Sequence, residues 1–158
     1  MIRKIISGGQ TGADRAALDL ASELGLPCGG WCPKDRKAED GPIEARYPLK
    51  ETPSADYAVR TEWNVRDSDG TLVFTQGELT GGTAQTVEMA ARLRKPCLVL
   101  DLAKQADVSA VHAWAREHRI GVLNIAGPRE SKSPGIYAQT AHVLRELLIS
   151  GAQRPQKQ

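Results

Sequence analysis

The order of apolar and polar residues along the chain predicts alternating strands and helices. Short, nearly continuous apolar runs are typical of strands that are covered on both faces of a parallel sheet. They lie at residues 2–6, 26–31, 71–75, 97–102 and 121–126. Apolar residues with helical spacing lie at residues 13–24, 61–67, 83–94, 107–118 and 134–149. This pattern predicts an α/β fold, a single Rossmann-like three-layer domain whose mainly parallel sheet of about five strands has helices on both faces.

Length and composition indicate one domain with a short tail. The chain has 158 residues, of which 41% are apolar and 25% charged, as in an ordinary globular protein. Residues 151–158 are polar, and we expect them to fray, which leaves residues 1–150 as the folded domain. Residues 33–42 are polar and rich in turn-forming residues, which predicts a long surface loop with a function.

Charge and cysteine content exclude several classes of function. The net charge is +2 with both signs interspersed, so nothing indicates a nucleic-acid or anionic membrane partner. No apolar run approaches the roughly 20 residues that span a bilayer. The charged residues Arg3 and Lys4 interrupt the apolar start of the chain, which therefore does not resemble a signal peptide, and we expect a cytoplasmic protein. The cysteines are odd in number, and Cys28 and Cys32 lack a second ligand pair, so we expect free thiols and no metal site.

Three turns between a strand and a helix carry the candidate chemistry. Residues 7–13 contain Gly8, Gly9 and Gly12, residues 80–83 contain a second glycine pair, and residues 127–133 form a third turn. Glycines allow close approach of the backbone, and helix N-termini present unpaired N–H groups to anions. Because all three turns follow strands of a parallel sheet, they are expected to face one crevice.

Hydroxyl and basic side chains accompany these turns and suit a phosphate or another tetrahedral oxyanion. Arg129 is one of the cations available in the third turn. The residues predicted to bind the ligand are Gly8, Gly9, Gln10, Thr11, Gly12, Arg15, Lys34, Arg36, Lys37, Gly81, Gly82, Thr83, Thr86 and Lys132.

Known catalytic and nucleotide-binding motifs do not occur in these turns. Residues 8–12 do not match G-x-G-x-x-G, and the chain contains neither a G-K-[ST] P-loop nor a G-x-S-x-G nucleophile elbow. Without a P-loop lysine or a nucleophile, the first turn is better suited to holding an anion than to transferring one. We therefore assign no catalytic residue on this basis.

As a set, the motifs resemble those of the molybdenum cofactor carrier proteins. The resemblance extends from residue 2 to about residue 148 and rests on residues 7–15, 30–31, 33–34, 36–41, 60–62, 64–65, 67–71, 80–83 and 123–129. It implies a circularly permuted branch of a Rossmann-like nucleotide-binding superfamily that also contains the lysine-decarboxylase-like phosphoribohydrolases. It further implies a homo-oligomer, a tetramer or dimer. The implied ligand is the molybdenum cofactor or an oxyanion such as molybdate or tungstate, which is not needed for folding, and molybdoenzymes are possible partners.

Three functions follow as hypotheses. The first is a non-catalytic carrier of an anionic small molecule. The second is a phosphoribohydrolase-like enzyme that cleaves the N-glycosidic bond of a nucleoside monophosphate, because Glu88 aligns with the glutamate of the P-G-G-x-G-T-x-x-E motif of the enzyme relatives. The proline, the third glycine and the following threonine of that motif are missing here. The third is a nucleotide sensor that acts through a partner protein.

Overall fold

The structure is a computed structural model that describes residues 1–152. The tail expected at residues 151–158 lies outside the described residues from residue 153 onward, whereas residues 151 and 152 belong to the last helix. Within the described part of the chain, no helix is long and apolar enough to cross a membrane.

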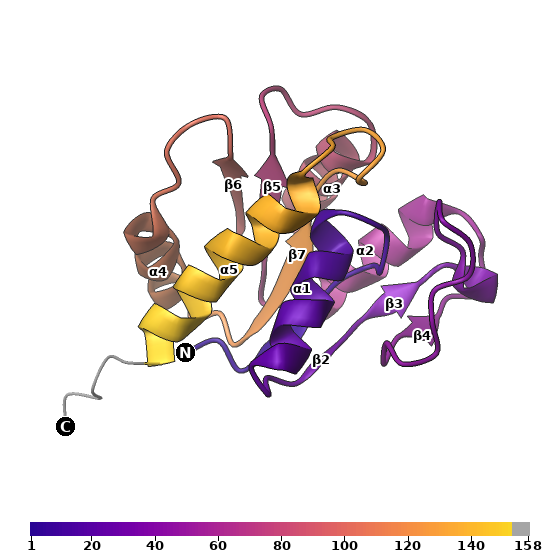
Figure 1. The fold of residues 1–158 in the computed structure, drawn as a ribbon, viewed down its shortest axis with the longest axis horizontal. Helices are drawn as coiled ribbons and strands as arrows, with labels where there is room; N and C mark the ends of the chain where they lie inside the picture. Colours follow the sequence, from indigo (N-terminus) through magenta and orange to yellow (C-terminus); the bar gives the residue numbers. More distant parts are fainter. Residues whose placement is uncertain (153–158) are drawn as a thin grey trace.

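Five parallel strands form the central sheet, which confirms the predicted fold class (Figure 1). Their spatial order is β2-β1-β7-β5-β6. The strands are β1 (Lys4–Ile6), β2 (Cys28–Gly29), β5 (Gly70–Thr75), β6 (Cys97–Asp101) and β7 (Val122–Ala126). All six residues of β5 are buried, which explains why its sequence is apolar without alternation.

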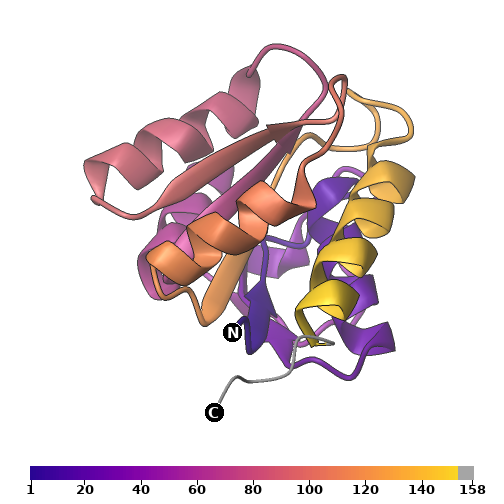
Figure 2. The same cartoon turned by 90° about the vertical axis from the view of Figure 1, so that its left-hand side faces the viewer.

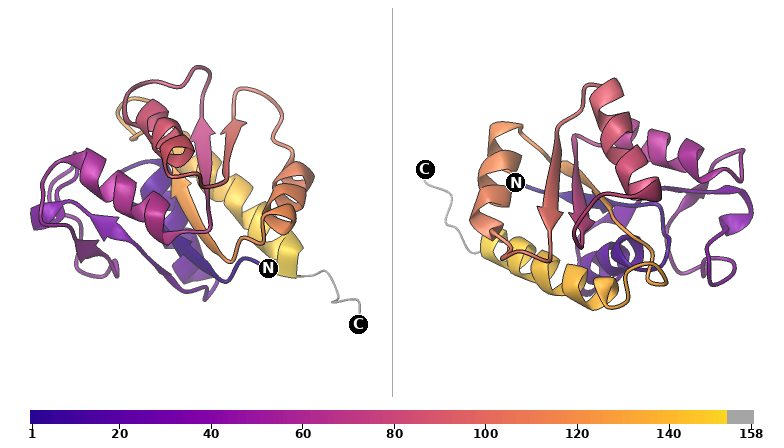
Figure 3. Two further views of the ribbon diagram at one scale, coloured as in Figure 1. Left: turned by 180° about the vertical axis from the view of Figure 1, so that it is seen from behind. Right: turned by 90° about the horizontal axis from the view of Figure 1, so that it is seen from above.

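Helices cover both faces of this sheet. On one face lie α1 (Ala13–Glu23), α4 (Val108–Glu117) and α5 (Ile136–Ala152). On the other lie α2 (Tyr57–Asp67) and α3 (Gly81–Arg92) (Figure 3). In Figure 2, α3 and α5 are seen on opposite sides of the strands. The main core is formed where α1, α4 and α5 pack on the sheet, with Phe74, Leu123 and Leu144 fully buried.

The predicted strand at residues 26–31 is split in two. After β2 the chain turns at Gly30, whose φ is +126°, and a Cβ there would overlap the backbone oxygen of Ser7. The next strand, β3 (Trp31–Cys32), leaves the central sheet and pairs in parallel with β4 (Lys50–Glu51). The long polar segment between them begins with a short 3₁₀ helix, η1 (Lys34–Arg36).

Helices α2 and α5 begin at residues other than those that the periodicity predicts, and at the start of each a carboxylate accepts hydrogen bonds from backbone N–H groups. Helix α2 starts at Tyr57, four residues before the predicted start, because the carboxylate of Asp56 accepts a hydrogen bond from the Ala58 N–H (3.0 Å). Helix α5 starts at Ile136 rather than residue 134, and the Glu130 carboxylate accepts hydrogen bonds from the N–H groups of Gly135 (2.6 Å) and Tyr137 (3.0 Å).

The order of the strands produces a topological switch point. From β1 the chain passes through α1 to β2 on one side, whereas from β5 it passes through α3 to β6 on the other, and β7 lies between β1 and β5. In such sheets a crevice opens at the carboxyl ends of the strands where the order reverses. The segments after β1, β5 and β7 therefore meet at one edge of the sheet.

Gly12, which precedes α1, provides a test of how tightly these segments meet. Its φ is +79°, and a Cβ there would overlap the Pro128 carbonyl oxygen and lie 2.9 Å from the Glu130 nitrogen. We expect Gly12→Ala to lower the free energy of unfolding, measured by urea denaturation, by about 3 kcal/mol through backbone strain and overpacking. The matched control is Gly25→Ala, where φ is +70° and no atom lies within 4 Å of the added Cβ. Its loss should be about 1 kcal/mol, and equal losses in the two variants would contradict the steric argument.

Candidate functional site

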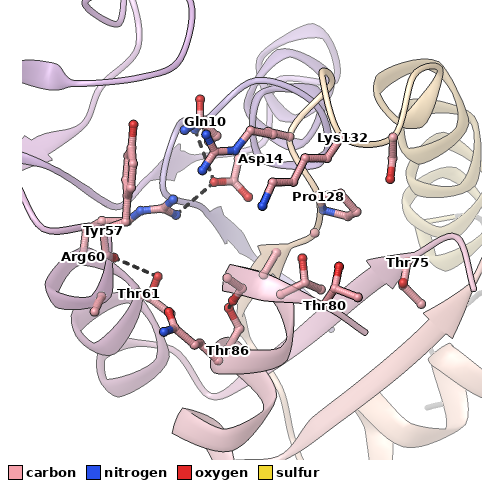
Figure 4. Close-up of a pocket in the computed structure, with 18 of the residues that line it drawn as sticks. Gln10, Asp14, Tyr57, Arg60, Thr61, Thr75, Thr80, Thr86, Pro128 and Lys132 are labelled. Atoms are coloured by element: carbon pink, nitrogen blue, oxygen red, sulfur yellow. Dashed lines mark hydrogen bonds and ion pairs between the residues drawn. The ribbon is translucent and has the colours of Figure 1, made fainter. Parts of the chain in front are cut away.

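A cavity of about 590 Å³ lies at the switch point, at the carboxyl ends of the sheet strands (Figure 4). Its walls come from four segments: the first glycine turn and the start of α1, helix α2, the segment from the end of β5 into α3, and the segment after β7. Three of these four are the turns that the sequence predicts to face one crevice. The fourth, α2, supplies Tyr57, Arg60 and Thr61.

In the first turn, the glycines contact neighbouring protein segments. Added Cβ atoms would overlap the Arg60 side chain at Gly8 and the side chains of Leu49 and Ile43 at Gly9, and Gly12 packs on the β7–α5 segment. Gln10 and Asp14 are the residues of this region that line the cavity.

Polar side chains fasten the first turn to its surroundings. Thr11 donates a hydrogen bond to the Glu39 carboxylate and accepts one from the Glu130 N–H (3.1 Å). The Gln10 side-chain oxygen accepts hydrogen bonds from the N–H groups of Thr11 (3.0 Å) and Glu39 (2.9 Å). These bonds fix the orientation of the amide and leave its buried Nε2 without a partner among the described residues.

Four basic residues in the first half of the chain are predicted to bind the ligand, but none of them lines the cavity. Arg15 pairs with Asp40 and donates to the Gly9 carbonyl (3.0 Å). Arg36 donates to four backbone carbonyls, those of Ile43 (2.8 Å), Glu44 (2.7 Å), Tyr47 (2.9 Å) and Leu49 (3.2 Å), and so holds the long loop together. Lys34 belongs to η1, and the ammonium of Lys37 lies 4.7 Å from the centre of the Tyr57 ring at the edge of the cavity.

The second turn opens directly into the cavity. Gly82, Thr83 and Thr86 line it, and the position that a Cβ would take at Gly81 lies 3.2 Å from the Lys132 ammonium nitrogen. Thr80, the N-cap residue of α3, makes no side-chain capping hydrogen bond. The first N–H groups of α3 therefore have no partner within the helix, and the positive end of the helix dipole lies beside Lys132.

The third turn adds cations with few protein partners. Lys132 lines the cavity and forms no ion pair with any residue in 1–152. The guanidinium of Arg129 lies 5.6 Å from the centre of the Tyr57 ring, and its Nε is 4.0 Å from a Glu39 oxygen. Both side chains could donate to an anion in the cavity.

Glu39 links the long loop to the first and third turns. Its carboxylate accepts hydrogen bonds from Thr11 and from the Ser131 hydroxyl (2.5 Å) and N–H (3.2 Å). Desolvation alone would raise the pKa of Glu39, but the hydrogen bonds from Ser131 and Thr11 and the charge of Arg129 together hold that pKa below its usual value. The charged form of Glu39 therefore holds the long loop to the first and third turns.

Asp14 and Arg60 form a buried ion pair in the cavity lining, which is not predicted from the sequence. The carboxylate of Asp14 accepts a hydrogen bond from Arg60 (3.1 Å), and the side chains are 4% and 15% exposed respectively. Burial raises the pKa of the Asp14 carboxyl, although the Arg60 guanidinium and the N–H of Gln10 oppose the shift. The sequence does contain a signal for burial of Asp14, because this residue lies among the alanines of the apolar face of α1. An acidic residue in the first turn of a helix is, however, usually explained by its interaction with the helix dipole.

The remaining chemical candidates lie elsewhere. Glu88 is exposed on α3 and does not line the cavity. The three cysteines are free thiols, and desolvation raises the pKa of Cys97 to about 11. Among the described residues, no cluster of three or more histidine, cysteine or acidic side chains is arranged to hold a metal ion.

The Arg60–Asp14 pair can be tested through stability. Arg60→Met leaves a buried carboxylate unpaired, and we expect a loss of about 3 kcal/mol in the free energy of unfolding at pH 7. Because the pKa of Asp14 is already higher than its usual value and would rise further in this variant, protonation favours the folded state, and the loss should shrink as the pH falls toward 4. Urea denaturation at several pH values measures this effect.

The double variant Asp14→Asn/Arg60→Met is the control for that experiment, because it removes both charges. It should recover part of the stability that Arg60→Met loses at pH 7. A loss in Arg60→Met that does not depend on pH would contradict the assignment to the Asp14 carboxylate.

Comparison with known proteins agrees with the resemblance found in the motifs. The model of the circularly permutated YpsA SLOG family matches residues 5–148. The crystal structure of a "putative molybdenum carrier protein" from Syntrophus aciditrophicus is 51% identical to this chain and superposes with a TM-score of 0.90 over 93% of this chain and 95% of that one. No curated protein sequence gives a significant match. The family match covers most of the chain, and the chain therefore belongs to the circularly permutated YpsA SLOG family.

Proposed function

We propose that this protein is a binding protein that carries an anionic, molybdenum-related small molecule in the cavity at the switch point. The observation that supports the proposal most directly is the convergence of Lys132 with the N-terminus of α3 at Gly81. A lysine ammonium beside unpaired helix N–H groups is a suitable environment for a phosphate or a similar oxyanion.

Neighbouring groups strengthen this anion subsite. The hydroxyls of Thr83 and Thr86 line the same wall, although the hydroxyl of Thr86 already donates to the Gly82 carbonyl (2.9 Å). Arg129 adds a second cation from the same turn as Lys132. In this proposal, Gly81, Gly82, Thr83, Thr86 and Lys132 touch the anion, whereas Gly8, Gly9, Thr11, Gly12, Arg15, Lys34, Arg36 and Lys37 build the frame around it.

The nature of the ligand follows from family likeness and cavity size. The similar Syntrophus protein is named as a molybdenum carrier, which supports the molybdenum cofactor, molybdate or tungstate as ligands of this chain. A cavity of about 590 Å³ is in the range that binds organic molecules of cofactor size. The resemblance to carrier proteins also supports a cytoplasmic homo-oligomer, a dimer or tetramer, that delivers its ligand to molybdoenzymes.

The hydrolase hypothesis has less structural support. It depends on Glu88, and this side chain is exposed outside the cavity lining. A carboxylate that stabilises the positive charge developing on the sugar during cleavage has to lie within reach of the bound substrate. We therefore favour binding without turnover as the function of the cavity.

The carrier proposal predicts binding that depends on Lys132. Isothermal titration with molybdate, tungstate, AMP and the isolated molybdenum cofactor should detect at least one ligand, and Lys132→Ala should weaken its binding about tenfold or more, because a hydrogen bond to a charged group is worth about 1.5–3 kcal/mol. Lys104→Ala removes an exposed lysine outside the cavity lining and should leave the affinity unchanged. The absence of binding at millimolar concentrations of all four ligands would refute the proposal.

A further inference from the structure

The proposed anion site does not use the buried carboxylate of Asp14, which also lines the cavity. Three acidic residues line the cavity, and two of them, Asp56 and Glu78, are exposed. Asp14 is 3% exposed. It is therefore the one buried carboxylate in the described lining, and it shares the cavity with Lys132 and Arg129.

The two oxygens of this carboxylate have different surroundings. Oδ2 accepts hydrogen bonds from Arg60 (3.1 Å) and from the Gln10 N–H (3.3 Å). Oδ1 accepts none from residues 1–152, and it is not among the buried side-chain atoms that lack a partner, so it is open to the cavity. In Figure 4, the end of the Lys132 side chain points toward the region of Asp14, and both residues line the cavity. The wall at Asp14 thus offers an acceptor, whereas the segment with Arg129 and Lys132 offers positively charged donors.

A free tetrahedral oxyanion uses only part of this arrangement. Held at Lys132 and the N-terminus of α3, it has no organic part that brings a hydrogen-bond donor to Asp14. Such an ion is only a few times larger than a water molecule, which occupies about 30 Å³ in the liquid, so it would fill a minor part of the cavity of about 590 Å³. A larger ligand that carries an anion at one end and a hydrogen-bond donor at the other uses both walls.

We propose that Asp14 determines specificity in this cavity: its Oδ1 accepts a hydrogen bond from an N–H or O–H group on the organic part of a phosphate ester whose phosphate is held at Lys132 and the N-terminus of α3. The inference rests on the proposed anion site and adds the class of ligand. Both a pterin phosphate and a nucleoside monophosphate have this chemistry, because each joins a phosphate to N–H or O–H donors. Free molybdate has no hydrogen-bond donor, and the O–H of hydrogen phosphate belongs to the anion itself, so neither ion carries donors on an organic part.

The first test uses the unaltered protein. Titrations compare inorganic phosphate with GMP and with neopterin phosphate, and the organic phosphates should bind about tenfold tighter or more. Where GMP binds more tightly than inorganic phosphate, two analogues identify the donor: 1-methyl-GMP lacks the ring N–H, and 2′-deoxy-GMP lacks a sugar hydroxyl. If inorganic phosphate binds as tightly as both organic phosphates, the inference is overturned, whereas the anion site itself stands.

The second test uses Asp14→Asn, which keeps the shape of the side chain and removes its charge. The preference for the organic phosphate over inorganic phosphate should fall about tenfold, because Asp14 no longer offers a charged acceptor. Glu117→Gln is the control, since it removes the same charge from an exposed acid outside the cavity lining, and its preference should equal that of the unaltered protein. Circular dichroism establishes that each variant is folded before titration.

An unchanged preference in folded Asp14→Asn would overturn the inference and leave the carrier proposal intact. The carrier proposal fails separately, if the unaltered protein binds none of its anionic ligands. Should Asp14→Asn not fold, the comparison of inorganic phosphate with GMP and neopterin phosphate on the unaltered protein decides the question, and the inference is overturned if neither organic phosphate binds more tightly than inorganic phosphate.

Discussion

The contact between Arg60 and Asp14 fixes the position of the cavity walls. Asp14 is in the first turn of α1, on one face of the sheet, and Arg60 is in α2, on the other. The Arg60 side chain packs against Gly8 of the first glycine turn, which has no Cβ and so leaves room for Arg60 to reach Asp14. A second link comes from Asn64 of α2, whose side chain bonds both the N–H (2.8 Å) and the carbonyl (2.9 Å) of Trp31. Helix α2 is thereby held as the fourth wall of the cavity.

The glycines of the first turn pack against other segments of the protein. Glycines next to a helix N-terminus are expected to let a ligand approach the backbone, but here the free space is taken by Arg60, by Leu49 and Ile43, and by Pro128. The turn is a junction at which the long loop, helix α2 and the segment after β7 meet. The open helix N-terminus is that of α3, beside Lys132, so the anion site proposed above lies at the second and third turns.

Local patterns predicted what depends on local physics. Strand and helix positions follow from apolar periodicity, and the meeting of three turns follows from the rule that carboxyl ends of parallel strands share one edge. The partners of charged side chains depend on contacts distant in sequence. Arg15 and Arg36 resemble solvated or ligand-binding cations in the sequence, yet Arg15 pairs with Asp40 and Arg36 with four carbonyls of the long loop. Asp14 and Arg60 are 46 positions apart, and no spacing rule connects them.

The energetics of Asp14 connect the fold to its ligand. Burial raises the pKa of this carboxyl despite the opposing charge of Arg60. The free-energy cost of desolvating the charged form is therefore larger than the stabilisation that its partners provide. Apolar residues of similar size would fill the same space without that cost. A ligand donor at Oδ1 would offset part of it and would stabilise the folded protein through binding. On the proposal above, the charge of Asp14 weakens the empty fold and gains a donor from the ligand, as expected of a group that selects what enters the cavity rather than one that only holds the chain together.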